Sequence, residues 1–159
     1  HLAGMAGATL IFAPHANSYD RLVPDAHAPT CICWGYDNRT AALRVPGGAP
    51  AARRIEHRVA GGDTNPYLTF AVVLGAAMVG MEDAMTPPPP IEGSAYEQGL
   101  PQLAPDWESA INLFEIDPVM ARVLPTELIR NMVLTKRQEM REMAERPVSE
   151  HWKTYLDTV

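Results

Sequence analysis

The hydrophobic pattern predicts one short helix and three strands in the N-terminal part of the chain. Small apolar residues fill positions 3–12, which is typical of a buried helix, and this helix is expected to end before Pro14. Three short runs with strand-like patterns follow, at Thr30–Trp34, Ala41–Val45 and Arg54–Val59. In the last two runs apolar and charged side chains alternate, so the two faces of each strand differ in character.

The rest of the pattern is that of helices. Asn65 and Pro66 indicate a helix start, because asparagine caps a first turn and proline fits the first helical position. This helix continues to Met85 and is apolar nearly all round, which predicts burial in a larger body. Pro87–Pro90 is expected to end it and to form a stiff surface spacer. Further helices are expected at 105–116, 118–123, 125–144 and 149–157.

Together these elements predict an α+β fold, in which a few antiparallel strands are backed by helices and followed by a helical C-terminal tail. Residues 1–86 are expected to hold the strands, 87–104 a proline-rich loop, and 105–159 a helical segment of the same domain. Any interface between two domains is expected within 86–104. Such a piece on its own exposes a sheet edge and apolar helix faces, so we expect it to dimerise or aggregate.

Composition narrows the class of protein. The 159 residues are 47% hydrophobic and 20% charged, which is typical of a globular chain. A net charge of -6 and a pI near 5.3 argue against nucleic acid as the main partner. No apolar run approaches the roughly 20 residues of a transmembrane helix, and the apolar start lacks a cationic leader, so we expect no membrane and a cytoplasmic location. The chain begins with His rather than Met, which favours a fragment of a longer protein.

Arginines are concentrated in one part of this acidic chain. Six of its 13 lysines and arginines fall within a quarter of its length. Because arginine binds phosphates and carboxylates in bidentate fashion, this density predicts a bound anion. The six are Arg21, Arg39, Arg44, Arg53, Arg54 and Arg58. Glu56 lies among these arginines and indicates a metal ion as well.

The two cysteines, Cys31 and Cys33, fit small apolar strand residues of a protein in a reducing compartment.

The strand-like run at Arg54–Val59 places three ionic groups on one face. Period-two spacing aligns Arg54, Glu56 and Arg58, and it turns His57 toward the core side. Such a face lines a wet functional cleft, or it forms a salt-bridge network on a solvated strand. A carboxylate between two arginines stays ionised at neutral pH and can bind a hard cation.

Four motifs follow one another along the chain: NSYDRLVPDAHAP, WGYDNRTAALRVP, ARRIEHR and NPYLTFAVVLGAAMVG. In this order and spacing they resemble the C-terminal part of the glutamine synthetase catalytic domain. The resemblance covers about 17–83 and the opening helix, with a looser match in the tail. It implies ATP and Mg²⁺ or Mn²⁺ as cofactors, glutamate as substrate and a ring-shaped homo-oligomer for the full-length protein.

The same resemblance implies roles for individual residues. Family members phosphorylate the γ-carboxylate of glutamate with ATP, and an amine then displaces the phosphate from γ-glutamyl phosphate. Phosphoryl transfer depends mainly on positioning and charge neutralisation, which suits a set of arginines with a metal ion. The implied roles are Arg21 for glutamate, Arg58 for glutamate or the phosphoryl group, Arg39 for the transferring phosphoryl group, Arg44 and Arg54 for the ATP phosphates, and Glu56 for the metal.

One departure from the family concerns the amine. Ammonia-using members carry a glutamate just before Ala-Pro, where this chain has His27. A neutral imidazole cannot hold NH₄⁺ by charge, although it can act as a base. This favours a γ-glutamyl-amine ligase, such as a γ-glutamylputrescine synthetase, over a glutamine synthetase that uses ammonia. Asp20, in place of a basic residue, suits a cationic polyamine or is surface variation.

Other readings stay open beside the ligase. The family's Glu-x-Glu metal ligands, metal histidine and N-terminal domain would lie upstream of this chain, so we expect the chain alone to be inactive. A non-catalytic scaffold that retains the fold is the second hypothesis, and an unrelated small anion-binding module is the third.

Overall fold

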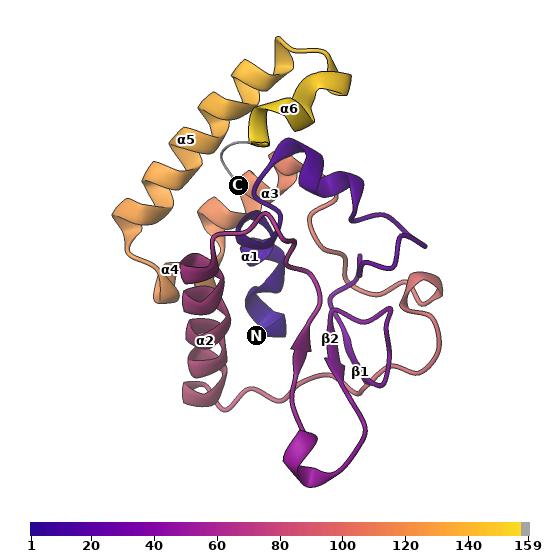
Figure 1. The fold of residues 1–159 in the computed structure, drawn as a ribbon. Helices are drawn as coiled ribbons and strands as arrows, with labels where there is room; N and C mark the ends of the chain where they lie inside the picture. Colours follow the sequence, from indigo (N-terminus) through magenta and orange to yellow (C-terminus); the bar gives the residue numbers. More distant parts are fainter. Residues whose placement is uncertain (157–159) are drawn as a thin grey trace.

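A small sheet and a group of α-helices lie side by side in the computed structural model, which describes residues 1–156 (Figure 1). This α+β architecture confirms the predicted fold class. Within the described residues the strands are β1 Trp34–Tyr36, β2 Leu43–Val45 and β3 Glu56–His57. The α-helices are α1 Met5–Phe12, α2 Pro66–Glu82, α3 Trp107–Ile116, α4 Pro118–Val123, α5 Thr126–Ala144 and α6 His151–Tyr155.

Helix boundaries follow the local signals in the sequence. The side chain of Asn65 accepts hydrogen bonds from the backbone N–H groups of Tyr67 and Leu68, at 3.0 and 3.2 Å, so α2 begins where the cap predicts. The helices α3 to α5 also lie where they are expected. The closing helix, α6, is shorter than the helix expected at 149–157, because a 3₁₀ turn at Val148–Glu150 precedes it. Position 157 of that expectation lies outside the described residues.

The sheet is mixed, which corrects part of the prediction. The pairing of β2 with β3 is antiparallel, as expected, with Arg44 opposite Glu56. The pairing of β1 with β2 is parallel, with Trp34 opposite Leu43. Between these strands the chain reverses twice: Asp37 takes a φ of 47°, and Asn38 Oδ1 then accepts from the backbone N–H and hydroxyl of Thr40 at 3.0 and 2.7 Å. Strand direction depends on this loop, which a hydrophobic pattern does not encode.

The segment after α2 covers the free edge of β1. The indole Nε1 of Trp34 donates to the carbonyl of Pro88 at 2.6 Å, and the N–H of Ile91 donates to the carbonyl of Trp34 at 2.9 Å. Further along, Asn38 Nδ2 donates to the carbonyl of Gly93 at 2.8 Å. The proline-rich stretch is therefore bound to the sheet, and it protects an edge that would otherwise offer unpaired backbone groups.

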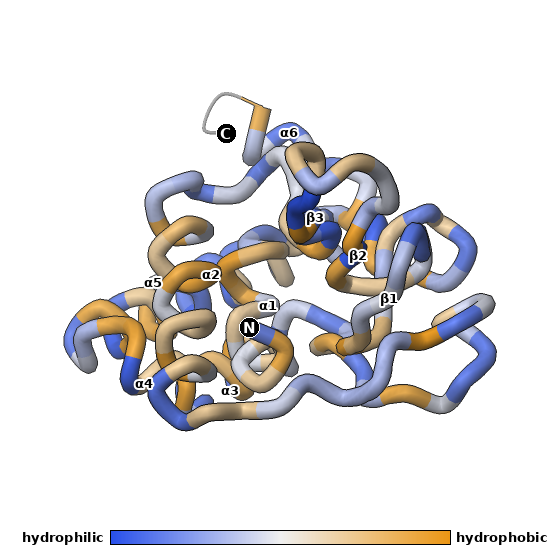
Figure 2. The backbone as a smooth tube through the Cα atoms, turned by 90° about the horizontal axis from the view of Figure 1, so that it is seen from below, coloured by the Kyte–Doolittle hydropathy of each residue, from blue (hydrophilic) through white to orange (hydrophobic). Residues whose placement is uncertain are grey.

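Helix α2 buries only one of its faces within this chain. Val72, Ala76 and Val79 are buried, whereas large apolar side chains on other faces are exposed. Figure 2 shows mostly tan and orange residues along this helix, in keeping with its apolar sequence. The exposed apolar side chains of α2 are Tyr67, Phe70, Leu74, Met78 and Met81. Among the described residues, no helix is long and apolar enough to cross a bilayer.

The core is built around α1, which packs against α3 and α2. Phe12 and Phe114 are fully buried there. Gly7 allows α1 to approach the start of α4 very closely: a Cβ at this position would lie 2.3 Å from Cβ of Asp117. Asp117 is itself fixed, because its Oδ1 accepts from the N–H groups of Val119 and Met120 at 2.8 and 2.9 Å and so caps α4.

We expect Gly7→Ala to destabilise the chain by about 2 kcal/mol, although alanine is favoured over glycine in a helix by about 1 kcal/mol. The added methyl group would displace Asp117 and weaken the cap of α4. Gly80→Ala in α2 is the matched control, because its Cβ would meet open space. Urea unfolding of the two variants measures the difference. Equal midpoints for both would show that the α1–α4 contact is not tight.

Candidate active site

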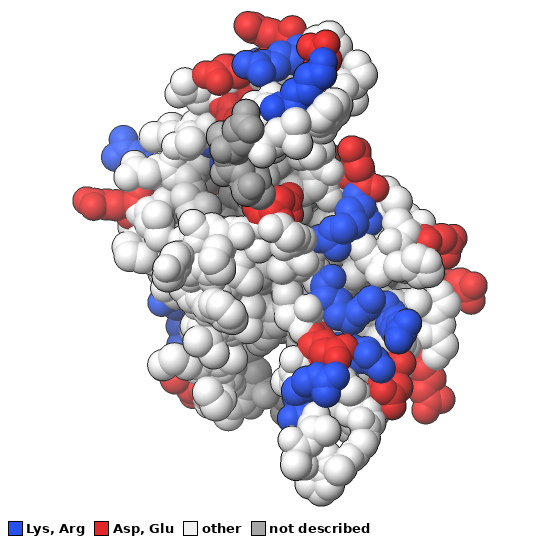
Figure 3. All heavy atoms as spheres, viewed as in Figure 1, with Lys and Arg blue, Asp and Glu red and all other residues white. Residues whose placement is uncertain are grey.

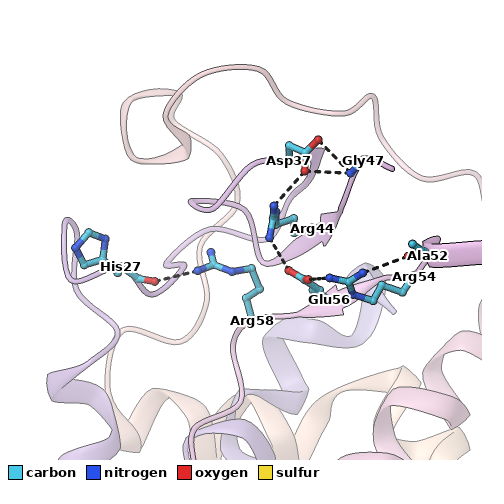
Figure 4. Close-up of polar contacts among 8 residues, drawn as sticks. All are labelled: His27, Asp37, Arg44, Gly47, Ala52, Arg54, Glu56 and Arg58. Atoms are coloured by element: carbon cyan, nitrogen blue, oxygen red, sulfur yellow. Dashed lines mark hydrogen bonds and ion pairs between the residues drawn. The ribbon is translucent and has the colours of Figure 1, made fainter. Parts of the chain in front are cut away.

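A row of alternating charges crosses the sheet from Asp37 to Arg54 (Figure 4). The strand register places Arg44 opposite Glu56, and Arg44 Nη1 donates to Glu56 Oε2 at 3.0 Å. Through Nη2 the same guanidinium donates to Asp37 Oδ1 at 3.1 Å. From the other side Arg54 Nη2 donates to Glu56 Oε1 at 2.7 Å. Both oxygens of Glu56 are therefore held by arginines, one from β2 and one from the loop before β3.

These contacts keep the two carboxylates ionised. Partial burial acts to raise the pKa of Glu56, but hydrogen bonds from Arg54 and Arg44 outweigh it and hold the pKa below the usual value. The pKa of Asp37 is also lowered, first by the N–H of Gly47, which lies 3.0 Å from Oδ1, and then by Arg44. The row therefore carries fixed charges of both signs at neutral pH.

Arg58 continues this row toward the loop that carries His27. Its Nη2 donates to the carbonyl oxygen of His27 at 3.2 Å. Its Nη1 is buried and has no hydrogen-bond partner in the described part of the chain. Nε of Arg44 is likewise buried and has no partner there. A buried guanidinium N–H without an acceptor is costly, so two unused donors, one on β2 and one directly after β3, indicate a site that an anion completes.

Arg21 lies at the end of a 3₁₀ turn, η2 (Ala16–Asp20). Its Nη2 donates to the carbonyl oxygen of Val59, just beyond β3. Burial lowers the pKa of this guanidinium and the nearby Asp63 opposes that shift, but arginine stays protonated at neutral pH. The side chain is thus a partly buried cation beside the strand that carries Glu56 and Arg58.

His57 faces the core, as the alternation along its strand predicts. Its ring packs against Phe12 with centroids 4.3 Å apart, and its Nε2 accepts from the N–H of Ala60 at 3.0 Å. Burial, with a further contribution from Arg21, lowers its pKa to about 4. This histidine is neutral at physiological pH and serves the packing of β3 rather than the charged row.

Arg39 lies apart from the row, in a surface hollow of about 430 Å³. The end of β1 and the segment Pro90–Gly93 line this hollow. The side chain is exposed, and no ion pair joins it to another described residue. Asp37 connects the two places, because it lines the hollow and also binds Arg44.

His27 is exposed on a loop with an unusual backbone. Its φ is 59°, and that of Asp25 is 64°. Figure 4 shows the imidazole ring turned away from Arg58, which contacts only the backbone of this residue. The ring is therefore at the rim of the row and accessible from outside.

Charged side chains of the sheet region lie together on one face of the molecule (Figure 3). Figure 3 shows blue side chains in a band on the side of the sheet, with red carboxylates among them. Of the residues implied by the sequence, Arg44, Arg54 and Glu56 are directly joined, with Arg58 beside them. Sequence reasoning missed Asp37 as a partner of Arg44, although its place directly after β1 was a possible signal.

The described residues alone do not form a metal site. No group of three or more His, Cys, Asp or Glu side chains that could hold an ion is found among residues 1–156. Glu56 is a single carboxylate with two guanidinium partners. It can supply one hard oxygen ligand, and the other ligands of any metal would have to come from beyond the described residues.

Comparison with known proteins shows which family this chain is similar to. The family described as "Glutamine synthetase, catalytic domain" matches residues 1–155, so the match includes the helical tail. A gamma-glutamylethanolamide synthetase of Streptomyces coelicolor is 39% identical over 127 residues, which cover 78% of this chain and 27% of the relative. A gamma-glutamylputrescine synthetase of Escherichia coli is 41% identical over 98 residues, covering 61% and 21%. A glutamine synthetase of Methanocaldococcus jannaschii is 35% identical over 134 residues, covering 79% and 30%.

A solved structure shows the same fold. The GmaS protein in a complex with ADP superposes with a TM-score of 0.79 at 29% identity, over 98% of this chain and 38% of that one. The chain spans 21 to 30% of the length of the three curated relatives above. Its fold and its match over residues 1–155 agree: the chain belongs to the glutamine synthetase family and forms part of the catalytic domain.

Proposed function

We propose that the full-length protein joins an amine to the γ-carboxylate of glutamate, with ATP as energy source and γ-glutamyl phosphate as intermediate. The family and its relatives support ATP-dependent ligation to glutamate in general. The observation that carries the proposal is the pair of buried guanidinium donors without partners, Arg58 Nη1 and Arg44 Nε, beside ionised Glu56. A site with unused cationic donors next to a carboxylate suits a phosphate chain and a divalent ion.

Arg44 and Arg54 would bind the phosphates of ATP. Both already point toward the same place, since each donates to one oxygen of Glu56. Glu56 would be one ligand of Mg²⁺ or Mn²⁺, and the bound ion would neutralise phosphate charge. Arg39 would stabilise the phosphoryl group in transfer, because its exposed guanidinium is not engaged by a carboxylate among the described residues.

Arg21 and Arg58 would bind glutamate. A carboxylate is well matched by the planar fork of a guanidinium, and both side chains flank the end of β3. Arg21 is anchored through one nitrogen to Val59, which fixes its position and leaves other N–H donors for a substrate.

His27 would help to select the amine and act as its general base. Its ring is accessible at the rim, where a fixed carboxylate would favour a small cation such as NH₄⁺. Three relatives of this chain have names that refer to amines larger than ammonia: a gamma-glutamylethanolamide synthetase, a gamma-glutamylputrescine synthetase and a glutamate–isopropylamine ligase. We therefore favour a γ-glutamyl-amine ligase, with ammonia-dependent glutamine synthesis as the alternative.

We expect the full-length enzyme to use ethanolamine or putrescine with a kcat/KM at least about 10-fold above that for ammonium. His27→Glu should move this ratio toward ammonium, because it restores a negative charge at the rim. His27→Gln, which adds no charge, is the matched control and should not restore ammonium use. Release of ADP in the presence of glutamate and each amine measures the rates. Fast turnover with ammonium alone would refute the role of His27.

A further inference from the structure

A half-buried polar cluster ties the C-terminal helices to the N-terminal part of the chain. Glu139 on α5 is at its centre: Oε1 accepts from the hydroxyl of Tyr155 at 2.8 Å, and Oε2 accepts from Nζ of Lys136 at 2.7 Å. Nδ1 of His15 lies 3.5 Å from Oε1. Burial opposes ionisation of Glu139, but the contacts with His15, Lys136 and Tyr155 lower its pKa to about 2. The carboxylate is therefore a fixed negative charge.

The members of this Glu139 cluster come from distant parts of the sequence. His15 and Glu139 are 124 residues apart, and Tyr155 lies on the last described helix. The rings of His15 and Tyr155 pack at a centroid distance of 4.2 Å. Helix α6 contacts η2, and Figure 1 shows it beside the indigo segment that follows α1. The tail is thus attached to η2 by packed rings and charged hydrogen bonds together.

The η2 turn connects this cluster to Arg21. The N–H of His15 donates to Oγ of Ser18 at 3.1 Å, and the N–H of Ser18 donates back to the carbonyl of His15 at 3.1 Å. Oγ of Ser18 in turn donates to Asp63, the carboxylate that acts on Arg21. Arg21 is the residue directly after this short turn. A shift of His15 would therefore move the backbone that carries the guanidinium.

We propose that Glu139 is a positioning residue for Arg21, so that the C-terminal helices set the affinity for the amino-acid substrate without touching it. This rests on the proposed role of Arg21 in binding the glutamate carboxylate. A 3₁₀ turn of five residues has few internal hydrogen bonds, so it depends on outside contacts for its orientation. An error of about 1 Å in a bidentate clamp is enough to weaken binding of a carboxylate strongly.

The test compares two ion pairs that hold α5 in the full-length enzyme. Glu139→Ala should raise the KM for glutamate about 10-fold, while kcat and the KM for ATP change less than about 2-fold. Glu139→Gln retains one acceptor oxygen, which can still accept from the hydroxyl of Tyr155 beside His15, but it loses the acceptor for Lys136, so it should recover part of the affinity. The matched control is Glu115→Ala, which removes the contacts of Arg137 at 3.3 Å and closer between α5 and α3, but does not reach η2. Equal effects of Glu139→Ala and Glu115→Ala on the KM for glutamate would overturn the proposal.

A second measurement separates this proposal from the proposed function. Amide hydrogen exchange of residues 16–22 should accelerate in Glu139→Ala and not in Glu115→Ala, whatever the enzyme's substrate is. If wild-type protein shows no reaction with glutamate, the proposed function fails while exchange still reports the coupling. Tyr155→Phe keeps the ring and removes the hydroxyl that donates to Glu139, so it serves if Glu139→Ala does not fold. Unchanged exchange in these variants would exclude the connection through η2.

Discussion

Arg39→Ala should lower kcat of the full-length enzyme by about a thousandfold, with less than about a fivefold change in the KM for glutamate. The proposed role of this guanidinium is to neutralise charge that develops on the transferring phosphoryl group, so its loss raises the barrier rather than weakening substrate binding. Its exposed position in the hollow beside β1 leaves it accessible to that group.

The structural cost of this change should be small, which makes the result easy to interpret. No carboxylate among the described residues is paired with Arg39, so alanine leaves no buried charge behind. Urea unfolding of Arg39→Ala should therefore match wild type. Arg53→Ala is the control, because Arg53 is another exposed arginine of the same arginine-rich part of the sequence and has no assigned role. ADP release under saturating substrates measures kcat, and near-normal turnover in Arg39→Ala would contradict its assignment.

Local features of the fold could be predicted from sequence because their causes are local. The start of α2 follows from the cap and ring geometry of Asn65 and Pro66. The alternation along β3 correctly placed His57 on the core side, where the structure packs it against Phe12, and left Glu56 on the opposite face with Arg54. In each case the information lies within a few neighbouring residues.

Features that depend on how distant segments meet could not be predicted in this way. The parallel pairing of β1 with β2 follows from a six-residue loop in which Asp37 takes a positive φ, and nothing in the apolar pattern reports that reversal. The contact between His15 and Glu139 joins positions 124 residues apart. Glu56 shows both cases: its face was predicted from alternation, but its partner Arg44 depended on strand register.

Register also decides what the site can do. Since Arg44 and Glu56 are direct neighbours across β2 and β3, one strand pairing brings the arginine proposed to bind phosphate next to the carboxylate proposed to bind the metal. A shift of one residue would turn Glu56 toward Phe12 and the core. The charged row is therefore a property of the pairing as much as of the sequence motif.

Glu56→Gln in the full-length enzyme should raise the Mg²⁺ concentration for half-maximal activity by about 10- to 100-fold and lower kcat by about a hundredfold. Glutamine is nearly isosteric and its single carbonyl oxygen still accepts from one of the two arginines, Arg44 or Arg54, but it lacks the negative charge that binds a hard cation. Metal titration of ADP release at fixed ATP measures both values.

Asp37→Asn separates metal binding from an indirect effect through Arg44. Asp37 and Glu56 each accept one hydrogen bond from that guanidinium, at 3.1 and 3.0 Å, so both changes disturb it to a similar degree. Only Glu56 is proposed to touch the metal, and only Glu56→Gln should shift the Mg²⁺ dependence. If the two variants shift it equally, Glu56 acts by holding Arg44 in place, and the metal is bound entirely by ligands outside this chain.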